Sequence, residues 1–502
     1  MKMRTVNISL IIFFIGLCFT NYGQQKKINF SSKKSKGITV QKKRLLILWE
    51  NVVFTNNKSV MYCDSAIYDR GDNSFIAYRN IKINENDSLT LFGDSLHYIG
   101  NEQKAFIYGN VKVITDDILL EAPSLIFNQK NKIAYYNQGA FINDRKKGYK
   151  IKSGKGIFET KIKTIFFKED VELDHKDYDI TSDTLIYNTS SQTSNIIGET
   201  QIKTENSTIL CNKGWFNSNK NKSSLEGSII ISTQSYKFFA DSVFYNENTG
   251  ISYAEGNVKI IDDSSNIIIE GEFGTHNEKK DSAHIWKNAI LTQLDSTDTL
   301  KIYADQFIKI GDSIKNEIFC FNNVIIDGTQ LKGDCDSIYF NETDSLMKCI
   351  VQPVIWMGEN QVSGDKIEFK TYKGIIYKMF TKSNAMIISE NDTLHYDQIE
   401  GEEITSFFEK NKMYLMNVNG DGRVIYYSKD EKDSLITEIN EVASEKMNIY
   451  IEENQISRIN FLSSPKGLTE PLNKNSSSKF LDNFFIYPKR TYQEKYIEAN
   501  GD

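Results

Sequence analysis

The chain has 502 residues, with 29 Gly, only 5 Pro, 12% aromatic residues, 25% charged residues and a formal net charge of −6. So many aromatic residues exclude an intrinsically disordered chain, and six Cys over this length exclude a disulfide scaffold. The mild acidity argues against a general nucleic-acid binder. After residue 20, no apolar run approaches the roughly 18 residues that a membrane helix needs.

Residues 1–23 have the pattern of a secretory signal peptide. Lys2 and Arg4 form a short basic region, and the stretch from Val6 to Phe19 is mostly apolar. We expect cleavage near Gly23 and an exported protein, and loss of the two basic residues changes the formal charge from −6 to −8. An uncleaved anchor and a lipoprotein modified at Cys18 are the alternatives.

Residues 24–44 form a basic segment. It contains eight Lys and Arg residues, and no acidic residue occurs before Glu50. We interpret it as a flexible, solvated segment. The alternative is a segment that contacts an anionic surface such as lipid phosphates.

The strongest signal in the sequence is an internal repeat of about 30 residues. Each copy opens with an apolar pair separated by one residue, as in Asn110-Val111-Lys112-Val113. The first apolar positions of the twelve copies are 52, 81, 111, 141, 171, 202, 229, 258, 290, 324, 354 and 386. A fixed period over so many copies is typical of a stacked repeat architecture.

Within each copy the period is two, which predicts half-buried strands. Val111 and Val113 face one way in this pattern, and Lys112 faces the other. We therefore predict an all-β, elongated two-layer slab over residues 45–462, in which each repeat adds one strand to each of two facing sheets. Residues 463–502 are interpreted as a linker and a C-terminal tail that caps the last strands.

A second landmark is an Asp that recurs once per repeat, at positions 64, 94, 183, 241, 305 and 336. Its regular recurrence predicts a turn or strand-edge role. The sequence contains no zinc-ligand spacing, P-loop or nucleophile elbow. We therefore expect no enzymatic activity, no catalytic residue, no metal and no cofactor. An exported β-helix enzyme acting on carbohydrate, with clustered carboxylates, is the alternative.

The repeated Asn/Gly-Val-x-Val opening and the Asp-Ser-Leu-x-Tyr second half, as in Asp94-Ser95-Leu96-His97-Tyr98, resemble the OstA-like (organic solvent tolerance) family. The resemblance covers residues 45–462 and is greatest to the long version found in Bacteroidetes-type bacteria. It implies a periplasmic β-jellyroll with an apolar interior for the acyl chains of lipopolysaccharide or a related glycolipid. The implied partners are other β-slab proteins of the transport bridge or the outer-membrane translocon. An open slab end also predicts pairing with a second copy.

The inward rows of the repeats are the predicted lipid-binding residues. These are Val52, Phe54, Ile81, Ile83, Val111, Val113, Val171, Leu173, Val258, Ile260, Val324 and Ile326. The alternative is that they fill a core, as in a structural spacer or adhesin.

Five Cys remain after residue 23, so at least one is unpaired in a monomer. Cys320 and Cys349 are one repeat apart and precede equivalent strands. If repeats were spaced like neighbouring strands, about 4.8 Å apart, these two residues would be close enough for a disulfide. Free, buried thiols are the alternative.

Overall fold

The computed structural model describes residues 28–490, except 57–58, 86–88, 263–265, 295–298, 312–316, 330, 342, 373–374, 410–411, 430–434, 453–454 and 473–477. These residues form 34 β-strands and no helix, so the described chain has no helix that could cross a membrane. The prediction of an all-β jellyroll is confirmed. The chain divides into two units, residues 1–250 and 251–502.

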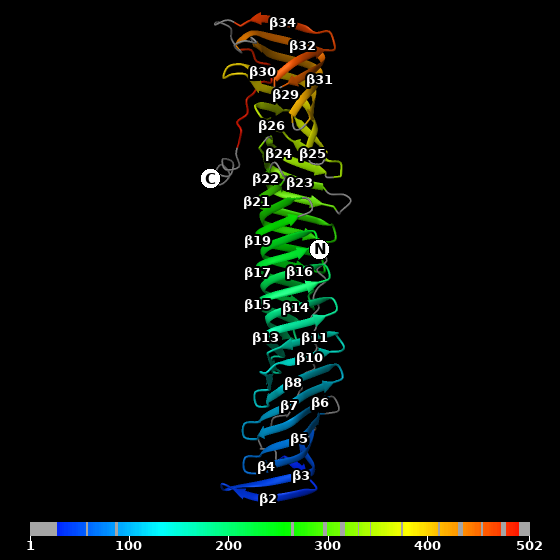
Figure 1. Cartoon of the computed structure of the whole chain (residues 1–502), viewed down its shortest axis with the longest axis vertical. Helices are drawn as coiled ribbons and strands as arrows, with labels where there is room; N and C mark the ends of the chain where they lie inside the picture. Colours follow the sequence, from blue (N-terminus) through cyan, green and yellow to red (C-terminus); the bar gives the residue numbers. More distant parts are fainter. Residues whose placement is uncertain are drawn as a thin grey trace. The chain divides into compact units, whose positions relative to one another are not determined.

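The first unit consists of antiparallel strands that follow one another in chain order (Figure 1). They are β1 (Asn29–Ser31), β2 (Lys34–Val40), β3 (Lys43–Asn56), β4 (Ser59–Asp69), β5 (Ser74–Glu85), β6 (Leu89–Ile99), β7 (Lys104–Thr115), β8 (Ile118–Asn128), β9 (Ile133–Tyr136), β10 (Ala140–Asp144), β11 (Tyr149–Ser153), β12 (Lys155–Glu159), β13 (Thr164–His175), β14 (Tyr178–Asn188), β15 (Thr193–Thr204), β16 (Ser207–Asn217), β17 (Lys222–Thr233) and β18 (Tyr236–Asn246).

The second unit is built in the same way. Its strands are β19 (Ile251–Asp262), β20 (Ile267–Asn277), β21 (Ser282–Leu294), β22 (Thr299–Ile310), β23 (Glu317–Asp327), β24 (Leu331–Asn341), β25 (Leu346–Ile350), β26 (Val354–Met357), β27 (Asn360–Ser363), β28 (Lys366–Tyr372), β29 (Ile375–Glu390), β30 (Tyr396–Glu409), β31 (Lys412–Lys429), β32 (Ile436–Glu452), β33 (Gln455–Phe461) and β34 (Lys466–Pro471).

Within each unit the long strands pair with their chain neighbours. Some long strands are interrupted and appear as two short ones, such as β9 with β10, which together flank β8. The outermost long strands are also flanked by two short strands each. These are β1 and β2 beside β3 in the first unit, and β33 and β34 beside β32 in the second.

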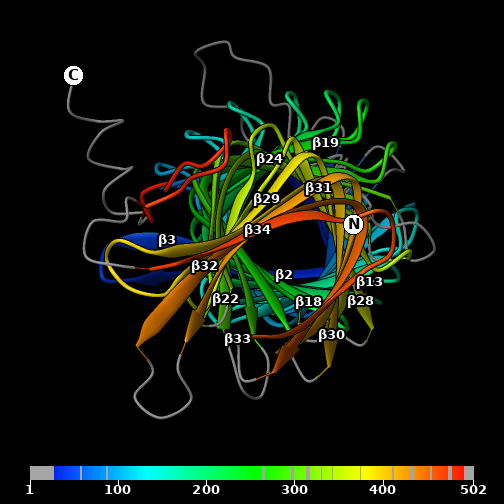
Figure 2. The same cartoon turned by 90° about the horizontal axis from the view of Figure 1, so that it is seen from above.

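A bulge bends every second long strand near its middle. In β5, Arg79 and Asn80 have φ of 61° and 52°, and the pairing with β4 shifts register between Tyr62 and Ser65. The same left-handed pair recurs at 50–51, 109–110, 169–170, 227–228, 256–257, 287–288, 322–323, 351–352, 383–384 and 420–421. A bulge bends its strand, and Figure 2 shows β29 and β31 curving in this way.

The bend places the two halves of the strands face to face as two layers. Phe54, in the second half of β3, stacks on Phe75, in the first half of β5, with ring centroids 4.3 Å apart. Each repeat is thus two strands, and each strand contributes to both layers. The expectation of one strand per sheet was wrong because the apolar pair after Asn begins the second half of a strand and not a new one.

At three of its positions, the recurring Asp accepts a hydrogen bond from the Asn at the bend of the next strand. The side-chain amide of Asn80 donates to Asp64 at 3.0 Å, that of Asn110 to Asp94 at 2.9 Å, and that of Asn323 to Asp305 at 3.1 Å. These three Asp residues lie in the middle of β4, β6 and β22, which are paired on both sides. The predicted turn or strand-edge role was therefore wrong, because the Asp binds the bend of the neighbouring strand from a mid-strand position.

The five described Cys are free and buried. Cys320 in β23 and Cys349 in β25 are both paired with Ile338 of β24, which lies between them. The expected proximity was wrong, because a repeat spans two strands and not one. Equivalent positions are therefore about 9.6 Å apart, twice the strand spacing, beyond the Cα separation that a disulfide permits.

Both predicted tails contain ordered strands. Residues 24–44 were interpreted as flexible, but β1 and β2 form there and pair with β3. The signal-peptide prediction, residues 1–23, lies outside the described residues. At the other end, β34 extends the sheet beside β32, and residues 478–490 run back across earlier strands instead of capping the last one.

We predict that replacement of Gly109 by Ala destabilises the first unit more than the same change at Gly148. Both glycines have left-handed φ, 75° and 74°. An added Cβ at Gly109 would overlap the Asp94 carboxylate, whereas none of the described atoms lies within 4 Å of one at Gly148. Backbone strain alone costs about 1 kcal/mol, and the overlap should raise the loss at Gly109 to about 2–3 kcal/mol. Urea denaturation of both variants checks this, and equal losses would contradict it.

We predict that all five Cys of the chain without residues 1–23 titrate as free thiols after denaturation. In the native protein they should react slowly at pH 8. Burial raises the pKa of Cys63 to about 12, with a further contribution from Asp64, and burial raises that of Cys211 to about 11. The reactive thiolate is therefore scarce at this pH. A count of three after denaturation would contradict the prediction.

Candidate functional site

An apolar cavity of about 150 Å³ lies between the two layers of the first unit and is partly open to solvent. Its wall comes from both halves of the bent strands. The apolar lining residues are Ile28, Phe54, Met61, Phe75, Ile83, Leu89, Leu91, Leu96, Tyr98, Ala105, Ile107, Leu125, Phe127 and Ala134. The polar ones are Thr55, Ser59, Gln103 and Gln129, which lie near the hairpin ends of the strands.

Aromatic rings form one continuous side of this cavity. Phe54 stacks on Phe75, and Phe75 stacks on Tyr98 at 5.5 Å. Burial raises the pKa of Tyr98, so its hydroxyl is neutral at physiological pH. Next to this row, Phe30 of β1 packs against Tyr68 at 5.3 Å. The cavity is therefore lined with uncharged side chains, as an apolar ligand requires.

The structure places all twelve predicted lipid-binding residues on the inner faces of the layers, by the alternation of their strands. Ten are buried: Val52, Phe54, Ile81, Val111, Val113, Val171, Leu173, Val258, Val324 and Ile326. Ile83 and Ile260 are half-buried. Only Phe54 and Ile83 line the cavity, and the other ten do not.

The prediction missed most of the cavity wall. Phe75, Ala105 and Ile107 precede the bend of their strands, and Leu91 and Leu96 lie on the second strand of the repeat. The alternation in Ser74-Phe75-Ile76-Ala77 indicates that Phe75 and Ala77 face inward. The prediction did not include them because it counted only the apolar pair after Asn as inward.

The described part of the chain contains no group of three or more His, Cys, Asp or Glu side chains that could hold a metal. What the cavity offers is an aromatic and aliphatic surface. A cavity of about 150 Å³ is large enough for a molecule of benzene size.

Residues 28–183 match the family model described as OstA-like protein. This part of the chain is similar to that family. The matched range contains every residue that lines the cavity.

Comparison with the curated proteins gives no match. One of the 26 matching chains among solved structures is LptH from Pseudomonas aeruginosa, described as the LptA homologous periplasmic component of the conserved lipopolysaccharide transport device. The match has 12% sequence identity and a TM-score of 0.11, and it covers 35% of this chain and 82% of that one.

We predict that replacement of Ile83 by Trp fills the cavity and weakens binding of an apolar fluorescent probe such as N-phenylnaphthylamine. Lys82 is the matched control, because it directly precedes Ile83 on β5 and is exposed. Probe titration of the Ile83→Trp and Lys82→Trp variants should show a several-fold loss of affinity only in the first. Equal affinities would mean that the probe does not enter the cavity.

Proposed function

We propose that this chain is a periplasmic carrier that holds the acyl chains of an anionic glycolipid, such as lipopolysaccharide, between its two layers and carries it toward the outer membrane. No bond is made or broken in this function. The observation that supports it most is the apolar cavity within the OstA-like residues, lined from both layers. The family resemblance supplies the class of lipid.

The cavity as it stands is too small to hold a whole acyl chain. Burial of an acyl chain gains about 0.8 kcal/mol per CH₂, so a chain of about twelve carbons gains on the order of 10 kcal/mol before any cost. The cavity accepts only part of such a chain. The layers must therefore part, which would separate the stacked rings of Phe54 and Phe75.

The head group would remain outside, near the polar hairpin ends and the basic strand β2. Lys34 and Lys43 are already paired with acids, at 2.5 Å from Glu50 and 2.5 Å from Asp72. Lys33 and Lys36 are exposed. We assign these two lysines to the phosphates of the glycolipid.

The outer edges of the sheets are the proposed contact sites for other β-slab proteins or a second copy. Among the described residues, β2 is paired with β3 only and β34 with β32 only. All residues of β34 are exposed. An unpaired edge offers its N–H and C=O groups to another strand.

A structural spacer is the second candidate function. It is favoured by the tight burial of ten of the twelve predicted residues. In that function the interior would stay closed and bind no lipid.

Photo-crosslinking in living cells distinguishes the two functions. A photoreactive residue at Ile83, which lines the cavity, should give lipopolysaccharide adducts, whereas the same probe at the outward Lys82 should not. Phe54 provides a second inward position. Absence of lipid adducts from both inward positions would favour the spacer.

A further inference from the structure

The C-terminal segment, residues 478–490, crosses the outer face of the second unit. Figure 1 shows it running back past β29 and β26. The strands beneath it form a cross-strand row in which Gln361 pairs with Ile388, Ile388 with Gln398, and Gln398 with Ile425. The residues next to this row, such as Ile387 and Ile399, belong to the inner face. The segment therefore lies outside the interior proposed for lipid.

Two buried glutamines hold the main chain of this segment. The Gln398 side chain donates to the carbonyl of Lys479 at 2.9 Å and accepts from the N–H of Leu481 at 2.8 Å. The Gln361 side chain does the same with the carbonyl of Phe485 at 2.8 Å and the N–H of Tyr487 at 2.9 Å. The glutamines are 0% and 4% exposed. Without the segment, both amides would lose these partners.

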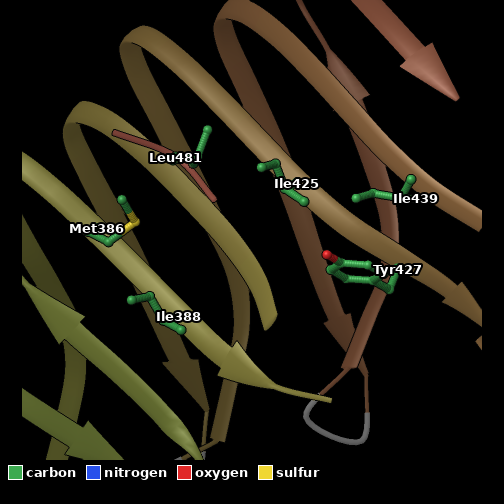
Figure 3. Packing of buried hydrophobic residues seen from close by; sticks show 6 residues of the cluster. All are labelled: Met386, Ile388, Ile425, Tyr427, Ile439 and Leu481. Atoms are coloured by element: carbon green, nitrogen blue, oxygen red, sulfur yellow. The ribbon is translucent and has the colours of Figure 1, made fainter. Parts of the chain in front are cut away.

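Two apolar side chains, Leu481 and Phe484, anchor the part of the segment that runs from the Gln398 contact to the Gln361 contact. Leu481 is 7% exposed and packs with Met386, Ile388, Ile425, Tyr427 and Ile439, as Figure 3 shows. Phe484 packs against the same cluster, and its ring centroid lies 5.4 Å from that of Tyr396. The two anchors flank a turn at Asp482 and Asn483, in which the N–H of Phe484 donates to the carbonyl of Leu481 at 3.0 Å. The site thus recognises the backbone on either side of this turn and the two apolar residues that flank it.

The outer face is specialised for this contact. Met386 occupies the position two residues after the bend, where Lys82 and Lys112 stand in the first unit. Lys112 is exposed and pairs with Glu121 at 2.7 Å. In the second unit, an apolar patch with two buried amides has taken the place of such solvated charges.

The segment itself is only partly buried. Phe480 and Phe485 are 50% and 57% exposed, and Ile486 and Tyr487 are also exposed. Its ion pairs are at the surface, including Arg423 with Asp482 at 3.2 Å. Exposed ion pairs contribute little. Besides the four glutamine hydrogen bonds and the two anchors, Ser478 donates to the carbonyl of Leu394 at 2.9 Å, and Asn483 donates to Glu400 at 2.5 Å. The segment adds no strand to the sheet, so these local contacts hold it in place.

We propose that the outer face of β27, β29, β30 and β31 is a binding site for a peptide with two apolar anchors on either side of a turn, and that the chain's own C-terminal segment is a ligand that dissociates from it. The segment and the site recognise each other without sharing a continuous sheet. This proposal does not depend on lipid binding.

The test uses a fluorescent peptide of residues 478–490 and two receptors in which the resident segment is disabled. One is the full chain with Leu481→Asp and Phe484→Asp, and the other ends at Leu472. Fluorescence anisotropy should show saturable binding to both. Binding to the wild-type chain should be at least about tenfold weaker, because its own segment competes at high effective concentration.

Matched variants test the geometry. Gln398→Leu in the disabled receptor should weaken peptide binding by about tenfold or more, since two hydrogen bonds are lost. Gln306→Leu is the control, because Gln306 lies on β22 and binds His284 at 2.8 Å. In the peptide, Leu481→Ser should weaken binding, and Ile486→Ser should not.

Two results would overturn the proposal. If both receptors retain their β-sheet circular dichroism and bind no peptide, the segment is not a ligand. If both receptors lose that signal, the segment is a permanent part of the fold. If Gln398→Leu and Gln306→Leu change the peptide affinity equally, Gln398 does not bind the peptide.

Discussion

The structure depends on strands that bend sharply without losing their neighbours. Most bends use two consecutive left-handed residues, as at Arg79 and Asn80, and the bend of β15 uses Gly198 alone. Left-handed backbone costs a non-glycine residue about 1–2 kcal/mol. Asn, Asp and Gly carry the lowest cost there. The Asn amide also binds the Asp of the preceding strand, as in Asn110 with Asp94. Because every second strand bends in this way, the repeat length equals two strands and their turns, about 30 residues.

The bend also decides where a ligand can enter. At the corner, the two layers are joined by covalent chain, so they cannot separate. At the opposite side, they end in hairpins, and the polar cavity residues Ser59, Gln103 and Gln129 lie there. Parting of the layers at this side breaks side-chain contacts such as that of Phe54 with Phe75 but no main-chain ladder. An apolar chain would therefore enter from the hairpin side.

The sequence was sufficient for features that repeat and insufficient for features that occur once. Alternation and period gave the all-β fold and the inward position of residues such as Val111 and Val258. Alternation and period did not show that the bend lies in mid-strand. We therefore expected Cys320 and Cys349 to lie on neighbouring strands, whereas β24 lies between them. The cavity depends on which inner side chains leave space, and this is a property of packing that a repeat does not specify. The site of Gln398 joins residues 81 to 83 positions apart, with no local signal in either segment.

Alternation gives each strand two faces whose sequences vary independently. In the first unit the inner row stays apolar, while the outer row is charged and solvated, as at Lys112 and Glu121. In the second unit the inner row is unchanged, at Ile387 and Ile399, but the outer row becomes apolar at Met386 and Ile388. An apolar outer face requires a cover, and a buried polar group in it requires a partner. Glutamine meets both requirements, because a neutral amide costs less to bury than a charge and pairs with the N–H and C=O groups of a passing chain as a strand would.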